Sequence, residues 1–161
     1  QQGVLRWPVA YRPGRLVARG MNGGGTVAEF VLETAGEPAR VQLNPDVRSM
    51  RANGRDVVQI GYVIVDAEGR RVPNAQHVVN FEFDGPVRLL GIGNANLSNT
   101  DPYQDASHPA WQGRGLAIFQ AGRRAGEVRI TARAEGLEPS TVTVEVLPAA
   151  GDGPAGRNSI D

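Results

Sequence analysis

The residues best suited to chemistry lie between Gly91 and Gly115, a long stretch rich in side chains that carry oxygen or nitrogen. Four of them suit a carbohydrate site, because amides bind sugar hydroxyls and an aromatic ring covers an apolar sugar face. These four are Asn94, Asn96, Tyr103 and Trp111. Oxygen ligands of the kind that Ca²⁺ prefers are also offered by Asn94, Asn96, Asn99, Asp101 and Asp105. Asn and Asp are ordinary turn residues too, so a purely structural loop is the favoured interpretation.

No other residues form a set with a catalytic pattern. Glu82 and Asp84 come nearest to a carboxylate pair, but their i, i+2 spacing on a strand predicts a solvent face without a desolvating pocket. His77 and His108 stand far apart and in no ligand spacing, which predicts surface or loop positions. We therefore predict no catalytic residue, no metal site and no cofactor, and that this chain is not itself an enzyme.

Composition excludes several classes of partner. Seventeen basic and seventeen acidic residues are scattered along the 161-residue chain and cancel, so no basic face for nucleic acid is expected. The absence of Cys excludes disulfides and thiolate metal sites. No apolar run approaches the ~18 residues that a membrane span needs, so no membrane insertion is expected.

Short runs rich in Val, Ile, Thr and aromatic residues, separated by Gly and Pro, predict an all-β protein, an antiparallel immunoglobulin-like β-sandwich. In segment 128–134 the apolar residues occupy every second position, which predicts one buried face and one wet face. The clearest strands are expected at 57–66, 78–83, 87–92, 115–120, 127–134 and 141–147. The side chains expected to point into the core are Val63, Val65, Phe81, Leu116, Ile118, Ile130 and Val144.

The chain is expected to have three parts. Residues 37–148 hold the sandwich, and residues 149–161 form a small, polar, flexible tail. Residues 1–36 contain strand-like runs at 4–11, 14–18 and 26–34, separated in part by a loop at 21–25, and so few strands cannot enclose a core. Trp7, Val9 and Tyr11 alternate as residues that face one core, so they should be exposed here.

The string from Trp7 to Leu16 resembles the closing hairpin of the domain that follows the catalytic barrel in bacterial β-galactosidases of glycoside hydrolase family 2. Residues 34–43 are similar to the junction into the C-terminal immunoglobulin-like domain of those enzymes, and segments 53–56, 63–69, 72–75, 81–86, 91–94 and 111–116 are similar to that domain itself. The ordered matches cover residues 7–146. Two positions depart from the usual pattern: residues 93–97 read Gly-Asn-Ala-Asn-Leu instead of Gly-Asn-Gly-Asp-Pro, and Trp111 replaces Phe.

The resemblance implies a non-catalytic accessory domain, preceded by the last strands of the domain before it, that packs against other domains of a β-galactosidase-like parent hydrolase. It also implies a periplasmic or secreted location. The catalytic glutamates of such enzymes belong to a barrel of ~250 residues, which this chain is too short to contain. Two alternatives remain: a carbohydrate-binding module of the same enzyme, and an adhesin-type immunoglobulin-like module with protein partners.

Overall fold

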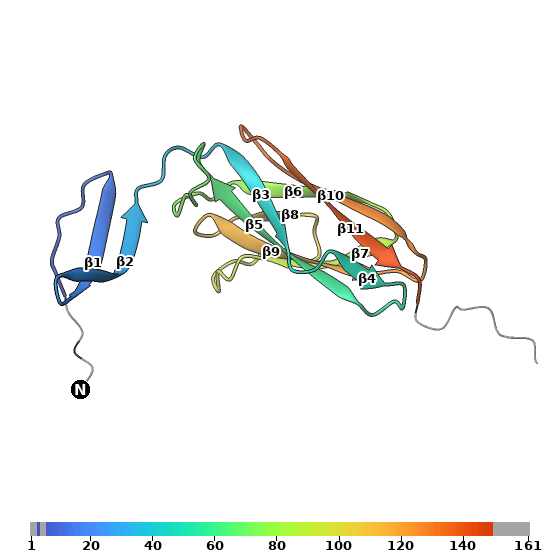
Figure 1. Cartoon of the computed structure of the whole chain (residues 1–161). Coiled ribbons are helices and arrows are strands. Elements are labelled where there is room, and N and C mark those ends of the chain that lie inside the picture. The colour runs from blue at the N-terminus through green and yellow to red at the C-terminus, as the bar shows by residue number, and fades with distance from the viewer. Residues whose placement is uncertain (1–2, 4–5, 150–161) are drawn as a thin grey trace, which may run out of the picture. The chain divides into compact units, whose positions relative to one another are not determined.

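The computed structural model describes Gly3 and residues 6–149, and these residues form strands and turns without a helix (Figure 1). The chain divides into two compact units, with the division between Ala35 and Gly36. Apart from residue 149, the predicted tail lies outside the described residues. Within the described part, nothing forms a helix of the length and apolarity needed to traverse a bilayer.

The first unit is a β-hairpin of strands β1 (Arg15–Asn22) and β2 (Gly25–Glu33), which pair antiparallel. The two residues between them, Gly23 and Gly24, have φ values of 56° and 82°. Positive φ at both central residues is the requirement of a two-residue type I′ turn, which matches the twist of the flanking strands. The strands therefore extend further into the predicted loop at 21–25 than the sequence suggested.

The two faces of this hairpin differ in chemistry. On one face the register places Leu16 opposite Leu32 and Ala18 opposite Phe30, and Phe30 is 65% exposed. The other face carries Arg15, Arg19, Glu29 and Glu33, with Arg19 Nε 2.7 Å from Glu29 Oε2 and Arg15 Nε 3.2 Å from Glu33 Oε1. The hairpin is thus amphipathic, with an uncovered apolar face.

The run expected as a strand at residues 4–11 is not a strand in its described part, residues 6–11. A strand needs a hydrogen-bonded neighbour, and these residues pair with none in the described chain. Trp7, Val9 and Tyr11 are 70%, 62% and 79% exposed, as expected for these three side chains.

The second unit consists of two packed sheets, which confirms the predicted sandwich (Figure 1). One sheet has the order β4 (Ser49–Arg51), β11 (Ser140–Leu147), β10 (Gly126–Ala134), β6 (Val78–Asp84) and β8 (Ser107–Pro109). The other has the order β3 (Arg40–Pro45), β5 (Val57–Val65), β9 (Arg114–Ala121) and β7 (Val87–Gly93). All neighbouring strands are antiparallel except β4 and β11, which are parallel.

Aromatic rings pack the two sheets together, three of them buried in the core and Phe83 at its margin. Tyr62 and Phe119 come from one sheet and Phe81 and Phe83 from the other. Phe81 meets Tyr62 edge to face with ring centroids 5.5 Å apart, and Phe83 meets Phe119 at 5.2 Å. Such pairs contribute beyond their buried area. Val128, Ile130, Ala132 and Val144 complete this core from β10 and β11 and are fully buried.

Of the seven predicted core residues, Val65, Phe81, Ile130 and Val144 are buried, whereas the predictions for Val63, Leu116 and Ile118 are wrong. These three lie on the outer face of their sheet, because the alternate residues of the same strands, Tyr62, Ala117 and Phe119, are the buried ones. In β5 and β9 apolar residues occur at both odd and even positions, so alternation alone did not decide which face is inside. The bulky rings of Tyr62 and Phe119 take the inner face instead.

The loop after β5 is organised by the buried carboxylate of Asp66, which is 1% exposed. One oxygen accepts hydrogen bonds from the backbone N–H of Gly36 and from Arg70 Nε, each at 2.8 Å, and the other accepts from the backbone N–H of Glu68 and Arg70. Burial opposes ionisation, but these hydrogen bonds and the Arg70 guanidinium outweigh it and lower the pKa of Asp66 to about 2.

We expect Asp66→Asn to flatten the acid dependence of stability. In the unfolded chain the carboxyl binds its proton near pH 4, so its contribution is complete above about pH 4 and is lost as the pH falls towards about 2. Thermal melts at pH 7 should place the variant below the parent chain, and the two curves should converge near pH 2. Asp105→Asn, at an exposed loop position, is the control and should follow the parent chain. A gap of equal size at both pH values would contradict this role.

Candidate functional site

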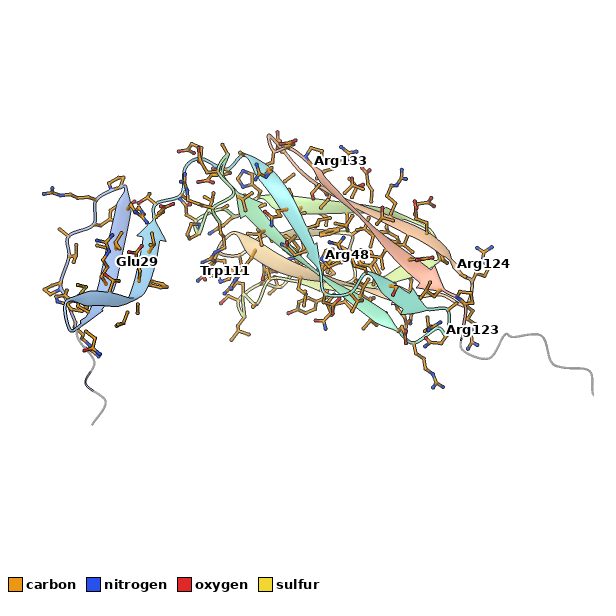
Figure 2. The ribbon with its side chains drawn as sticks, in the orientation of Figure 1. Glu29, Arg48, Trp111, Arg123, Arg124 and Arg133 are labelled. Atoms are coloured by element: carbon orange, nitrogen blue, oxygen red, sulfur yellow. The ribbon has the colours of Figure 1, made fainter. Side chains whose placement is uncertain are left out.

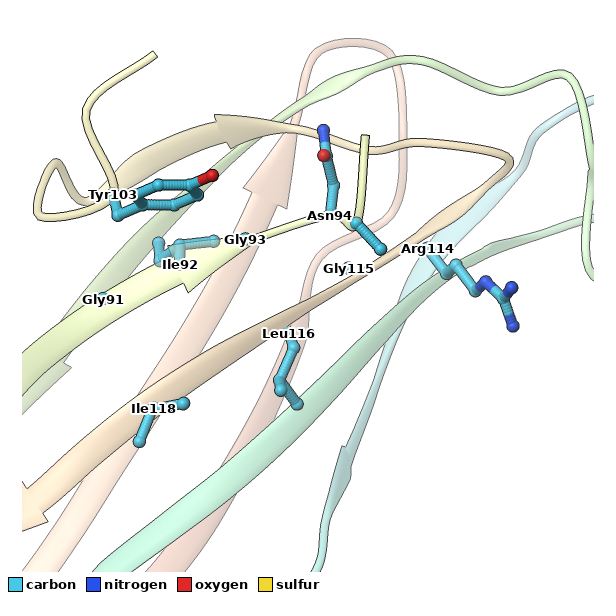
Figure 3. A pocket seen from close by; sticks show the side chains of 10 residues that line it. Gly91, Ile92, Gly93, Asn94, Tyr103, Arg114, Gly115, Leu116 and Ile118 are labelled. Atoms are coloured by element: carbon cyan, nitrogen blue, oxygen red, sulfur yellow. The ribbon is translucent and has the colours of Figure 1, made fainter. Parts of the chain in front are cut away.

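An apolar hollow of about 500 Å³ lies on the outer face of the sheet β3-β5-β9-β7 (Figure 3). Leu116 and Ile118 project into it from β9, and Tyr103 lies above β7 (Figure 3). Leu116 is 37% exposed and Tyr103 is 61% exposed. The remaining lining comes from Gly91, Ile92, Gly93, Asn94, Ala95, Arg114 and Gly115.

Two glycines on β7 make room for the Tyr103 loop. A Cβ at Gly91 would lie 3.2 Å from the Tyr103 carbonyl oxygen, and one at Gly93 would lie 3.6 Å from the Tyr103 ring. The Tyr103 carbonyl also accepts a hydrogen bond from the backbone N–H of Ile92, at 2.6 Å. The loop is thereby held against the strand, and its ring forms a fixed wall of the hollow.

The Tyr103 ring also stacks on His108 in β8, with centroids 6.2 Å apart and planes 10° from parallel. His108 is completely buried, which corrects the expectation of a surface or loop histidine. Its Nδ1 lies 3.2 Å from the carbonyl oxygen of Pro109, which also accepts from the Asn94 amide at 2.8 Å and the Tyr62 hydroxyl at 3.4 Å. The Pro109 carbonyl thus links residues of both sheets to His108, on which the Tyr103 wall of the hollow stacks.

The asparagines of the loop mainly hold its own backbone. The Asn94 side chain is 7% exposed, donates to Pro109 and accepts from the backbone N–H of Asn96 at 2.9 Å. The Asn96 side chain accepts from Ser98 at 3.1 Å, and that of Asn99 accepts from Asp101 at 2.6 Å. Each of the three bonds that an Asn side chain accepts closes an Asx turn, the usual role of these residues in loops.

The four predicted sugar-site residues are therefore only partly brought together. Asn94 and Tyr103 line the same hollow, whereas Asn96 and Trp111 are not among its lining residues. Trp111 is half-buried and forms an isolated bridge with Arg114. Leu116 and Ile118 are part of the site but were assigned to the core. Their signal was the pair Gly91 and Gly93, whose alternate spacing leaves the end of one face of β7 without side chains.

The other candidate groups remain dispersed. Glu82 and Asp84 are exposed, as predicted, and Glu82 Oε1 lies 3.2 Å from Arg133 Nε in a solvent-exposed ion pair. His77 is half-buried on the segment before β6, while His108 lies in β8. Among the described residues, no group of three or more His, Asp or Glu side chains is arranged to hold a metal ion.

These features define a β-sandwich domain with an open apolar hollow on one sheet. Residues 41–143 match the family described as Glycoside hydrolase family 2 C-terminal domain 5. The chain belongs to this family of C-terminal domains.

Similar proteins come from several bacteria. A beta-galactosidase of Bacteroides ovatus is 30% identical over 140 residues, which is 87% of this chain and 16% of that protein. A beta-glucuronidase of Formosa agariphila is 30% identical over 142 residues, 87% of this chain and 14% of that protein. The crystal structure of a family 2 glycosyl hydrolase from Bacteroides cellulosilyticus matches with a TM-score of 0.84 at 30% identity, over 88% of this chain and 18% of that one. The chain thus spans about a sixth of the length of the curated relatives it matches.

Proposed function

We propose that this chain is a non-catalytic C-terminal domain of a family 2 glycoside hydrolase, and that it docks through the apolar hollow onto another domain of the same polypeptide. Family membership and the much greater length of the relatives support a multidomain parent. The relatives named beta-galactosidase and beta-glucuronidase favour a parent that cleaves β-linked sugars. The proposed role of this domain is to stabilise and orient its neighbours.

The observation that carries the proposal is the half-exposed apolar floor formed by Leu116 and Ile118. Apolar side chains in a structurally fixed hollow are typical of the centre of an interface, where they are covered on assembly. The only charged residue of the lining is Arg114, which is exposed. An interior of this kind suits a protein surface better than the hydroxyl-rich surface of a polysaccharide.

Leu116→Asp tests the docking. In the isolated chain we expect a loss of unfolding free energy of about 1 kcal/mol, because the side chain is already partly in water although Asp is a poor strand former. In the full-length parent the same change should lower the unfolding temperature of this domain and separate its transition from that of its neighbours. The control is Val78→Asp, on the other sheet at a valine that is 49% exposed. Equal effects of the two substitutions in the parent would refute docking through the hollow.

Carbohydrate binding is the second candidate, favoured by the exposed Tyr103 ring beside the hollow. Titration of the chain with a neutral galacto-oligosaccharide, followed by NMR, separates the two functions. The docking proposal predicts no saturable shift at the amides of Gly93, Tyr103 and Leu116. Saturable shifts there, abolished by Tyr103→Ala, would instead establish a sugar site.

A further inference from the structure

A second hollow, of about 460 Å³, lies at the other end of β7 and β9 and has a different chemistry. Three arginines line it, Arg88, Arg123 and Arg124, and no carboxylate does. Arg123 and Arg124 both project from the turn between β9 and β10 at the end of the sandwich (Figure 2). The rest of the lining is Gly54, Gly85, Pro86, Val87, Gln120, Ala121 and Gly122.

The base of this hollow is fixed by backbone hydrogen bonds between three turns. The N–H of Gly122 donates to the Pro86 carbonyl at 2.7 Å, and the N–H of Gly54 donates to the Gly122 carbonyl at 3.2 Å. The Arg123 side chain lies along Gly54, where a Cβ would be 3.5 Å from its Cγ. Because Gly54 has no side chain, Arg123 extends across the turn without obstruction.

The side-chain amide nitrogen of Gln120 is available in this hollow as a hydrogen-bond donor. Arg88 and Gln120 are cross-strand partners, and Arg88 Nε donates to Gln120 Oε1 at 2.7 Å. This contact occupies the amide oxygen and leaves the amide nitrogen of Gln120 without a partner in the described part of the chain. Guanidinium groups bind carboxylates, an amide nitrogen binds hydroxyls, and the apolar faces of Pro86 and Val87 suit sugar C–H groups.

The positive charge is not neutralised from within the described residues. Arg123 and Arg124 take part in no ion pair there. Asp56, on the neighbouring turn, has both carboxylate oxygens engaged, by the Asn53 amide at 2.7 Å and the Arg51 N–H at 2.8 Å. These hydrogen bonds lower its pKa. The carboxylate of Glu127, whose backbone lies beside Gly85, is 3.4 Å from Arg129.

We infer that this arginine hollow binds the carboxylate and hydroxyl groups of an acidic oligosaccharide, such as a run of uronic acid residues. The inference rests on the proposed role as a domain of a glycan-cleaving enzyme, and it assigns a second site to it. The volume is within the ~300 to 1,000 Å³ of sites that enclose small ligands, whereas a stable protein partner needs a contact of about 1,000 Å² or more. A compact anionic sugar therefore fits better than an acidic protein segment.

The test is a titration of the chain with trigalacturonate, followed through its backbone amide NMR spectrum. We expect saturable shifts at Gly54, Gln120 and Gly122. Arg123→Gln with Arg124→Gln should weaken binding at least ten-fold. The control is Arg129→Gln with Arg133→Gln, which removes the same charge from the other sheet and should change binding less than two-fold. A dispersed spectrum shows directly that each variant is folded.

Three other ligands test which chemical groups the hollow recognises. Neutral galacto-oligosaccharide and inorganic sulfate should each bind at least ten-fold more weakly than trigalacturonate. The inference is overturned if a tetraglutamate peptide binds as tightly as trigalacturonate, because the hollow would then recognise an acidic protein segment. It is overturned equally if sulfate binds as tightly, if both double variants weaken binding alike, or if no saturable shift occurs. None of these results bears on docking through Leu116, which is measured in the parent enzyme without sugar.

Discussion

Replacing Gly115 by Ala should destabilise the sandwich by about 3 kcal/mol, although it adds a single methyl group. Gly115 pairs with Tyr62 across β5 and β9, and the Tyr62 ring lies directly over it. A Cβ at Gly115 would overlap the Tyr62 ring carbon and hydroxyl. Tyr62 is completely buried and also contacts Phe81 and the Pro109 carbonyl, so it has no free space into which to move.

Chemical denaturation monitored by circular dichroism measures this effect. Gly93→Ala is the matched control in the neighbouring strand, because its new Cβ would meet only the Tyr103 ring at an ordinary 3.6 Å. We expect that change to be within about 0.5 kcal/mol of neutral. In a Tyr62→Ala background the cost of Gly115→Ala should nearly disappear, since the colliding ring is gone. A cost that persists in that background would show that the ring is not the cause.

The second large effect is expected for Ile130→Ala, which should cost about 3 kcal/mol or more. Ile130 is completely buried at the centre of β10, paired on one side with Phe83 and on the other with Val142. Truncation removes buried methyl groups and leaves a cavity that the surrounding strands cannot close. The loss should appear as a lower denaturation midpoint with an unchanged denaturant slope.

Ile118→Ala is the matched control, because it makes the identical chemical change in a strand of the opposite sheet. Ile118 is only half-buried, on the outer face beside the hollow. We expect it to cost about 1 kcal/mol at most in the isolated chain. Similar losses of stability for the two variants would mean that the side chains of β9 face the opposite way, with Ile118 in the core.

Much of this fold is predictable from the sequence, for reasons that particular strands make clear. In β10 apolar and polar residues alternate without exception from Val128 to Ala134, so its buried face is unambiguous. In β9 both Leu116 and Ala117 are apolar, and so are Ile118 and Phe119, so the pattern fits either face. Strands β4 and β8 were not predicted, since three residues are too few to show a period.

The candidate site was harder to predict because it depends on contacts between distant segments. The sequence singles out Tyr103 by its type and its loop, and the structure places it beside the hollow. Its place over Gly91 and Gly93, and against His108 in β8, follows from the pairing of strands and not from local spacing. The asparagine-rich pattern around it proved to be turn chemistry, with Asn94 and Asn96 bound to nearby backbone.

The three-residue strands β4 and β8 border one sheet and bear on aggregation. An exposed strand edge offers unpaired N–H and C=O groups on which another chain can form a ladder, and short edges limit this. Strand β8 ends at Pro109, which has no N–H to donate, and the register shift between Leu89 and Gly91 interrupts the edge strand β7 of the second sheet. Edge-to-edge fibre growth through β4, β8 or β7 is thus disfavoured. Within the described part of the chain, the hairpin β1–β2 has two long strand edges and an uncovered apolar face, and self-association of the isolated chain should begin there.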